Sequence, residues 1–570
     1  IIEWLGRFTT TGGVEELWGA ANNAGTAALA RRAVGAWAAK SFSDTANVTN
    51  LRYMQGASLT HKFFLCYDSD VNRLHVWDGT TLRRVGFSIA TAVTAATMGG
   101  AGNTWNRWYR KRLAELDADG NIVRMSEPSE TPVNVSITDD AGVTVTRGTV
   151  NSEGETHWIA EAADDDGAGA PGTYFQIATV AIGTLTTNDT TADLTVFDLS
   201  PIIGEYIPPP SAKFILSDTN RILLAGAWET TGAADQTEPK QNRVWYTPVL
   251  GSTDQGDDER IPNTVEQQNW VDVGNEGPIT GLGGPLYGDI YVFKTDSIFK
   301  LTPTGDFVTP YRVIQMSAGI GAVDQRVICV GETGNGTPGI FFAAPGSVYV
   351  ITSGGISELS DPVSRDLRLN NFTAASSWIG YNPFSKSILA QTNSGSASLS
   401  GTYYQFEYSL KEQRWSGISI GGGESGWILG RSILGLDTTL GGGGATIRNI
   451  VVAQNDQSSV RLLLAGQNSS EASLLTSYGD VCGGDAADPF TTRFRIRKFP
   501  TPGHRFMIGA PTLIYRNPTG GDATGTLMVS IIDQNAELQT FTETLEATDQ
   551  DNGLQQKVLC IDGAQWENLT

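Results

Sequence analysis

Short apolar runs paired across tight turns recur along this chain, and they constrain its fold more than any other feature. In IYVFKTDSIFKLTP, residues 290–303, the runs YVF and IFKL flank Thr295 and Asp296, a polar pair suited to a turn. This pattern predicts a β-hairpin whose register is set by the turn. Similar units begin at His61, Lys213, Gly339, Lys386 and Asn449.

The spacing of these units is roughly 40 to 60 residues, the period of propeller blades with four strands each. A solenoid would need tighter and more uniform repeats, and a sandwich would not need so many equivalent hairpins. We therefore predict an all-β fold whose main part is a β-propeller of about six blades. Contacts between residues 61–86 and 449–466 are expected to close the ring.

Composition supports the all-β class. Among 570 residues there are 66 glycines, and charged residues make up 18%, which is far from the profile of a disordered chain. The chain has 61 acidic and 39 basic side chains, a net charge of −22. A groove that grips phosphates would need the opposite sign, so a soluble acidic surface is the simpler interpretation.

The cysteines and the chain ends give little functional information. The cysteines have no metal-ligand spacing and are interpreted as buried apolar thiols; they are Cys66, Cys329, Cys482 and Cys560. No apolar run approaches the roughly 18 residues of a membrane span, so no span is expected. No signal peptide is visible, but the chain starts at Ile1 without methionine, which leaves an earlier start or a removed leader open.

The pattern changes along the chain divide it into five parts. Residues 25–41 have plausible helical spacing and predict a helix within an N-terminal arm. EYIPPPSAK, residues 205–213, predicts a stiff proline linker. The expected parts are the arm (1–50), a first propeller blade (51–100), an inserted sandwich (101–205), the remaining blades (206–480) and a C-terminal β-sandwich (481–570).

The inserted part begins with WNRWYRKRLAELDADGNIVRMSEPSETPVNVSI, residues 105–137. This stretch resembles the closing strand pair of a fibronectin type III module, and we predict an Ig/fibronectin-III-like β-sandwich. Asp117, Asp119 and Asn121 lack the remaining ligands of an EF-hand loop, so they predict a hairpin turn. In the C-terminal part, the most basic strand is either a solvated face or a contact to an acidic neighbour; it carries Arg493, Arg495, Arg497 and Lys498.

No motif in the sequence indicates a catalytic site. There is no G-x-S-x-G and no phosphate-binding G-x-x-x-x-G-K, and the Gly-rich run 421–444 is interpreted as a flexible loop. His75, beside Trp77, is expected to be a packed strand histidine. Asp257-Asp258 and Asp164–166 could serve a glycoside hydrolase, but polar surroundings favour solvated turns. We therefore expect no enzyme activity and no catalytic, cofactor-binding or metal-binding residues.

The central segment resembles a virion protein. SAKFILSDTNRILLAGAW (211–228), GPITGLGGPLYGDIYVFKTDSIFKLTPTGDF (277–307) and SAGIGAVDQRVICVGETGNGTPGIFFAAPGSVYVITSGGISEL (317–359) are similar to the tail nozzle proteins of short-tailed bacteriophages, also called tail tubular protein B or tail hub. The resemblance implies a structural virion protein of the tail. In that family six copies form a ring-shaped conduit below the portal and adaptor, through which the genome leaves.

The partners implied by the resemblance are further copies of the chain, as a hexamer, and the adaptor on the portal side. Tail fibres or a needle are further candidates, and DNA would pass without specific binding. An acidic wall would repel that DNA, although at physiological salt the field fades over roughly 8 Å. Two alternatives stay open: a host-contacting tip or side component of a long phage tail, and a secreted propeller that binds or cleaves glycans.

Overall fold

The computed structural model of the chain divides into two compact units, Ile1–Ser425 with Thr439–Tyr478, and Gly426–Thr438 with Gly479–Thr570. Each is described by itself. The structure describes residues 2–23, 26–32, 37–40, 54–67, 74–226, 241–250, 256–275, 277–306, 309–361, 372–373, 377–383, 386–393, 403–418, 428–429, 431–432, 446–454, 460–467, 474–478, 512–516, 525–532, 538–545 and 554–558.

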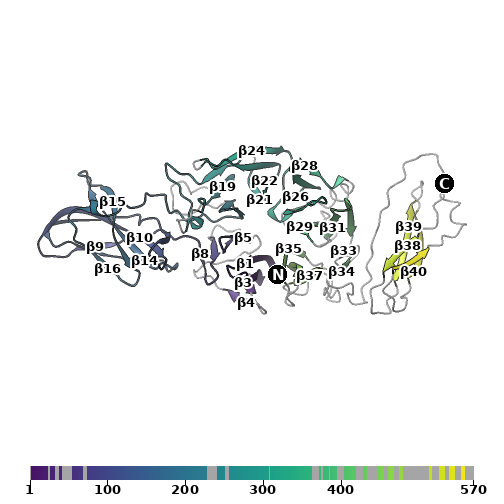
Figure 1. Ribbon diagram of the computed structural model, residues 1–570, viewed down its shortest axis with the longest axis horizontal. Helices are drawn as coiled ribbons and strands as arrows, with labels where there is room; N and C mark the ends of the chain where they lie inside the picture. The colour runs from purple at the N-terminus through teal and green to yellow at the C-terminus, as the bar shows by residue number, and fades with distance from the viewer. Residues whose placement is uncertain are drawn as a thin grey trace. The chain divides into compact units, whose positions relative to one another are not determined.

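The described residues fold almost entirely into antiparallel β-sheets, so the predicted all-β class is confirmed (Figure 1). Their helical elements are short 3-10 turns, among them η1 (Leu194–Val196), η2 (Asp257–Glu259) and η3 (Gln325–Val327). No helix among them is long and apolar enough to cross a membrane.

Six sheets of the first unit contain four strands each, paired in chain order. The first is β1 (Ile2–Thr9), β2 (Glu15–Asn23), β3 (Thr26–Arg32) and β4 (Ala38–Lys40). The second is β5 (Gln55–Leu59), β6 (Lys62–Cys66), β7 (His75–Trp77) and β8 (Leu82–Arg84). The third is β17 (Phe214–Asp218), β18 (Arg221–Ala225), β19 (Arg243–Tyr246) and β20 (Trp270–Asp272).

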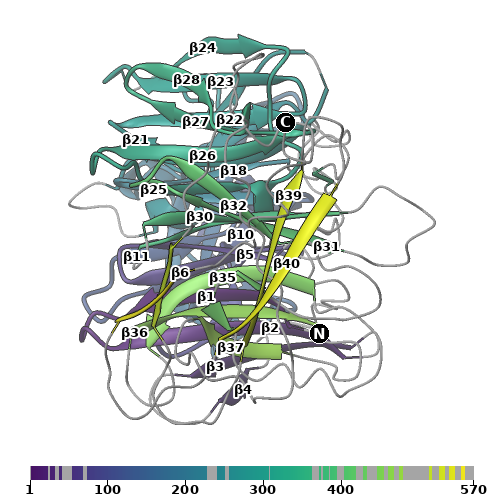
Figure 2. The same ribbon diagram turned by 90° about the vertical axis from the view of Figure 1, so that its right-hand side faces the viewer.

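The other three sheets follow the same plan, and Figure 2 shows their strands side by side. They are β21 (Ile279–Leu286), β22 (Asp289–Lys294), β23 (Ser297–Pro303) and β24 (Tyr311–Ala318); β25 (Ile328–Glu332), β26 (Pro338–Ala344), β27 (Ser347–Thr352) and β28 (Gly355–Glu358); and β29 (Trp378–Asn382), β30 (Ser387–Asn393), β31 (Tyr403–Ser409) and β32 (Arg414–Ile418). The hairpin predicted over 290–303 is β22–β23, paired as expected.

A three-stranded sheet completes the series: β35 (Thr446–Gln454), β36 (Val460–Gln467) and β37 (Leu474–Tyr478). The first strands of the seven sheets contact one another in the order β1, β5, β17, β21, β25, β29, β35, and β35 contacts β1 again. The return contact was expected between residues 61–86 and 449–466. Instead the N-terminal sheet stands at this place, because β1 lies against both β35 and β36.

The helix predicted over residues 25–41 is wrong. Strands β3 and β4 occupy the described part of this segment, and β3 pairs with β2 along its whole length. Leu29 of β3 is buried in a cluster that includes Trp4, Trp18 and Phe63. Burial in this aromatic cluster overrides the weak helical preference of an alanine-rich segment.

Apolar cores lie between neighbouring sheets. Phe63 of β6 stacks on Trp4 and Phe8 of β1, with ring centroids 6.0 and 5.4 Å apart. Further along, Phe293 of β22 and Phe342 of β26 pack at 5.1 Å. Each sheet thus buries its faces against the next sheet in the chain.

A separate module is inserted between β8 and β17. One of its sheets has the order β11 (Ile122–Met125), β10 (Asn103–Leu116), β14 (His157–Asp165), β15 (Pro171–Ala181), with β12 (Val133–Asp140) also paired to β10. The other has the order β16 (Thr186–Asp189), β13 (Val143–Thr146), β9 (Thr94–Thr97). The two sheets enclose one core, which includes Tyr109, Leu113, Val145 and Trp158. An Ig-like assignment of this module stays a prediction.

The second unit contains β33 (Ile428–Leu429) paired with β34 (Arg431–Ser432), β38 (Thr512–Arg516) paired with β41 (Leu554–Val558), and β39 (Gly525–Ile532) paired with β40 (Leu538–Leu545). Strands β33 and β34 fall within the Gly-rich run predicted as a loop. The basic residues at 493–498 and Cys482 and Cys560 lie outside the described residues. Cys66 is buried as predicted, and burial raises the pKa of Cys329 to about 12.

Glutamine side chains complete the edges of two first strands. The Leu282 amide of β21 donates to Gln325 Oε1 at 2.6 Å, and Gln325 Nε2 donates back to the Leu282 carbonyl at 2.8 Å. Similarly, the Ile215 amide of β17 donates to Gln55 Oε1 at 3.3 Å. The glutamine side-chain amides thus bond to backbone groups that a neighbouring strand would otherwise bond to at the edge of the sheet.

Truncating Gln325 should therefore destabilise the first unit. Gln325→Ala leaves the amide and carbonyl of Leu282 unpaired, and we expect a loss of about 1–3 kcal/mol in the free energy of unfolding. Denaturant melts followed by fluorescence measure it. Gln315→Ala on the exposed side of β24 is the matched control, and equal melts for both variants would contradict the role given to Gln325.

Lys111 gives the module a distinct pH dependence. It is fully buried and its Nζ donates only to neutral oxygens, those of Thr91, Arg147 and Thr149. Burial, and then the charge of Arg147, lowers the pKa of Lys111 to about 8. Between that value and the unfolded pKa of about 10.4 the unfolded chain binds more protons, so stability rises with pH over this interval.

We expect Lys111→Met to remove this rise. Urea midpoints of the wild type and the variant, compared at pH values from 7.5 to 10 (roughly the window set by the two pKa values), isolate the lysine from other titrating groups. Parallel pH profiles for the two proteins would show that Lys111 stays charged in the fold.

Candidate functional site

A buried ionic junction lies where the chain leaves β8 for the module and later returns to β17. We use this name for the turn 256–259, which contains η2, together with the charged side chains around it. The turn belongs to the connection between β19 and β20, so it reaches the junction from a different sheet than β8 does.

Glu259 lies at the centre of the junction. Its carboxylate accepts from Arg83 Nη1 and Nη2 at 2.7 and 2.8 Å, and from Lys62 Nζ at 2.9 Å. The amide of Gly86 adds a longer hydrogen bond of 3.2 Å. Burial alone raises the pKa of Glu259, but the charges of Lys62 and Arg83 outweigh it and hold the pKa well below the ordinary value.

The two neighbouring aspartates are also paired. Asp258 accepts from Lys62 Nζ at 2.9 Å and from Thr60 at 3.3 Å, and burial raises the pKa of Asp258. Asp257 accepts from Arg260 Nε at 2.9 Å. The expectation that Asp257 and Asp258 form a solvated turn is wrong, because both are at most 3% exposed.

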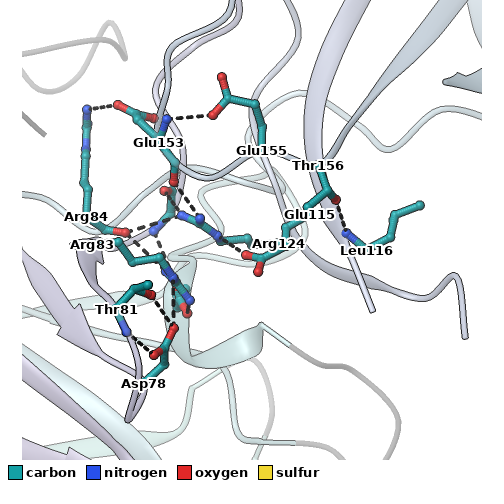
Figure 3. A network of polar contacts seen from close by, with 12 residues as sticks. Asp78, Thr81, Arg83, Arg84, Glu115, Leu116, Arg124, Glu153, Glu155 and Thr156 are labelled. Carbon is teal, nitrogen blue, oxygen red and sulfur yellow. Dashed lines mark hydrogen bonds and ion pairs between the residues drawn. The ribbon is translucent and has the colours of Figure 1, made fainter. Parts of the chain in front are cut away.

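The module contributes Arg124 of β11 to the junction (Figure 3). Its guanidinium donates to the carbonyl oxygens of Gly86 at 2.9 Å and Glu153 at 2.7 Å, and its Nε pairs with Glu115 at 2.5 Å. It also lies over the ring of Phe87, 3.9 Å from the centroid. Arg124 thus joins the chain segment that leaves β8 to strand β10 and to the loop that carries Glu153.

A second ion pair strengthens the same contact. Arg84 Nη1 lies 2.7 Å from the Glu153 carboxylate, which also accepts from the Ser88 amide at 2.7 Å (Figure 3). The Glu153 amide in turn donates to Glu155 at 2.6 Å. These contacts hold charged and backbone groups of different chain segments in fixed positions. The junction therefore has the character of a structural contact between segments.

Other residues singled out in the sequence lie elsewhere. Asp117 accepts from the amides of Asp119 and Asn121 at the β10–β11 turn, which confirms the predicted hairpin. Asp164 and Asp165 end strand β14, where Asp164 accepts from the buried Arg107 at 2.7 Å, and Asp166 lies in the exposed turn to β15. His75 is buried in β7, edge-on to Tyr67. Within the described part of the chain, no three His, Cys, Asp or Glu side chains are grouped to hold a metal.

The junction was not predicted, although the sequence contains a signal for it. Two arginines follow a short apolar strand in TLRRVG, and three carboxylates precede an arginine in DDER. Opposite charges placed inside such short buried stretches require a partner, since unpaired buried charges are very costly. Which of them meet could not be read from the sequence, because Arg83 and Glu259 are 176 positions apart.

No family model and no curated protein matches the sequence. Among solved structures, a crystal structure of an ancestral GH74 enzyme is similar at 10% identity, covering 84% of this chain and 68% of that chain, with a TM-score of 0.25. The expectation that the chain is not an enzyme is contradicted by this match to an enzyme, and we withdraw it. A likeness at this TM-score carries no argument for a particular activity.

Breaking the central ion pair should be costly. Arg83→Met removes the guanidinium that pairs with the buried Glu259 carboxylate, and we expect a loss of about 3–5 kcal/mol in the free energy of unfolding. The exposed pair Arg7–Glu15 provides the control, because Arg7→Met should cost at most about 1 kcal/mol.

Denaturant melts measure both losses, and the double variant Arg83→Met with Glu259→Gln should recover part of the stability. An Arg83→Met protein as stable as Arg7→Met would show that water reaches Glu259 and that the junction is not a buried ionic contact.

Proposed function

We propose that the seven sheets that contact one another in cyclic order are the blades of a β-propeller. The support is the order of first-strand contacts from β1 to β35 and back to β1. Six blades have four strands, and the last, β35–β37, has three described strands. The N-terminal sheet, expected to be an arm, then serves as the seventh blade.

We further propose that the protein is a structural component of a bacteriophage tail, a nozzle or hub that forms a ring-shaped conduit for genome ejection. The observation that carries this proposal is the place of the nozzle-like segments. They coincide with consecutive sheets: 211–228 includes β17 and β18, 277–307 includes β21 to β23, and 317–359 includes β25 to β28. The resemblance therefore follows the scaffold and not an isolated hairpin.

The charge of the chain fits this role. DNA bound by lysine or arginine gains salt-dependent affinity with each phosphate contact, and this would slow its passage. A chain of net charge −22 avoids such binding. In the module, the cations of β10 are also engaged internally, since Arg107, Arg110 and Arg112 all pair with carboxylates of the same module.

The proposed assembly is a homo-hexamer in the virion tail, joined to an adaptor-like ring. A ring of identical copies uses heterologous contacts, in which one patch meets a different patch on the next copy. Interfaces of this kind in permanent assemblies often bury more than about 2,000 Å².

Electron cryo-microscopy of the phage particle tests the proposal. We expect sixfold density below the portal and adaptor, with seven-bladed subunits around an open channel. A single copy on the outside of the tail, or a threefold assembly with a closed axis, would overturn the nozzle role and favour a host-contacting tip.

A further inference from the structure

We infer that the turn 256–259 is a conformational lock, which fixes the inserted module relative to the sheets on either side of the insertion and makes the two contacts interdependent. This inference concerns the branch point of the chain and does not depend on the proposed tail role.

Successive residues of the turn contact different parts of the molecule. Gly256 lies against the module, Asp258 contacts Lys62 and Thr60 at the β5–β6 hairpin, and Glu259 contacts Arg83 at β8. Asp257 acts through Arg260, whose Nη1 donates to Glu205 of the returning segment at 2.6 Å. A run of four residues therefore meets the module, the segment that leaves for it and the segment that returns.

The contact with the module is a close backbone approach. Gly256 has a φ of +92°, and a Cβ at this position would lie 1.6 Å from the carbonyl oxygen of Val123 in β11. No side chain fits in this space, and the left-handed backbone also favours glycine. The turn thus lies directly on the edge of the module.

Both segments that connect the module to the sheets are held next to this turn. On the outgoing side, the Gly86 amide donates to Glu259 and the Gly86 carbonyl accepts from Arg124. On the returning side, the Ile261 and Asn263 amides donate to the carbonyls of Ile207 and Gly204 at 2.8 and 2.9 Å. The module cannot pivot about either segment without breaking these bonds.

The energetics make the lock two-state. A partial opening would separate Glu153 of the module from Arg84 of β8 before water could reach either charge, and unpaired buried charges are strongly unfavourable. Close packing of the surrounding side chains likewise resists small displacements. The module is therefore held in one orientation or released, with no gradual movement between.

The lock also reaches the contact between the second and third sheets. The returning segment ends at Lys213, whose carbonyl accepts from Cys66 Sγ of β6 at 3.5 Å. Two residues later, the Ile215 amide donates to Gln55 of β5. Movement of the returning segment would pull on both of these bonds, so release of the module should loosen the neighbouring sheets.

Hydrogen exchange on the full chain tests the lock. Gly256→Val places a branched side chain against Val123 and should speed exchange of the Gly86, Asn263 and Ile215 amides by roughly tenfold or more. Gly277→Val is the matched control, because Gly277 has a similar φ of +83° but no atom within 4 Å of a Cβ. It should leave these three amides unchanged.

Amides within β10, β14, β22 and β23 should exchange as in the wild type, because their own cores are intact. Unchanged exchange at Gly86, Asn263 and Ile215 in a folded Gly256→Val protein would overturn the lock. So would equal acceleration throughout the module, which indicates unfolding and not release.

Should Gly256→Val fail to fold, Glu259→Gln replaces it, since this change keeps the side-chain shape and removes the charge that holds Arg83 and Lys62. Faster exchange at the same three amides supports the lock. Wild-type exchange at these amides in a folded Glu259→Gln protein overturns it.

Discussion

The burial of sheet faces between neighbouring sheets is the constraint on which the rest of the first unit depends. A four-stranded antiparallel sheet has two faces, and an isolated sheet of this size would leave apolar residues such as Phe63 or Phe293 in water. Here both residues pack against the adjacent sheet. Because each sheet covers the next, the end sheets of such a series leave a face uncovered unless they are capped or meet each other, and here β1 contacts β35.

The insertion of a whole module into this series creates a problem that apolar packing alone does not solve. The chain must leave one sheet, form two sheets elsewhere and return beside the place it left. Its exit and return bring backbone groups and charged side chains into a dry environment. Arg83 pairs with Glu259, while Arg124 donates to the Gly86 carbonyl and Glu259 accepts from the Gly86 amide. The ionic junction is thus the consequence of inserting a module without opening the sheets around it.

The sequence predicted what is local and periodic. Alternating apolar runs identified the hairpins β22–β23 and β26–β28, because two-residue periodicity and turn residues act over a few positions. The same reasoning failed at β3, where alanines permit several structures and burial of Leu29 decides between them. It failed again at Asp258, whose surroundings in sequence are polar but whose cation partner, Lys62, is 196 positions away in the chain. No window of sequence contains that information.

The charge distribution separates the roles of different acidic residues. Net charge −22 describes the whole chain, but Asp258 and Glu259 contribute little to the field outside the molecule, because they are buried against Lys62 and Arg83. Exposed aspartates such as Asp166 and Asp193 instead carry charge that reaches the solvent. Acidic residues therefore have two physical roles in this chain. Those in the junction hold chain segments together, and those on the surface give the molecule its negative outer charge. Only the electrostatic interactions of the surface carboxylates should weaken as the salt concentration rises, since screening by ions acts on charges that water can reach.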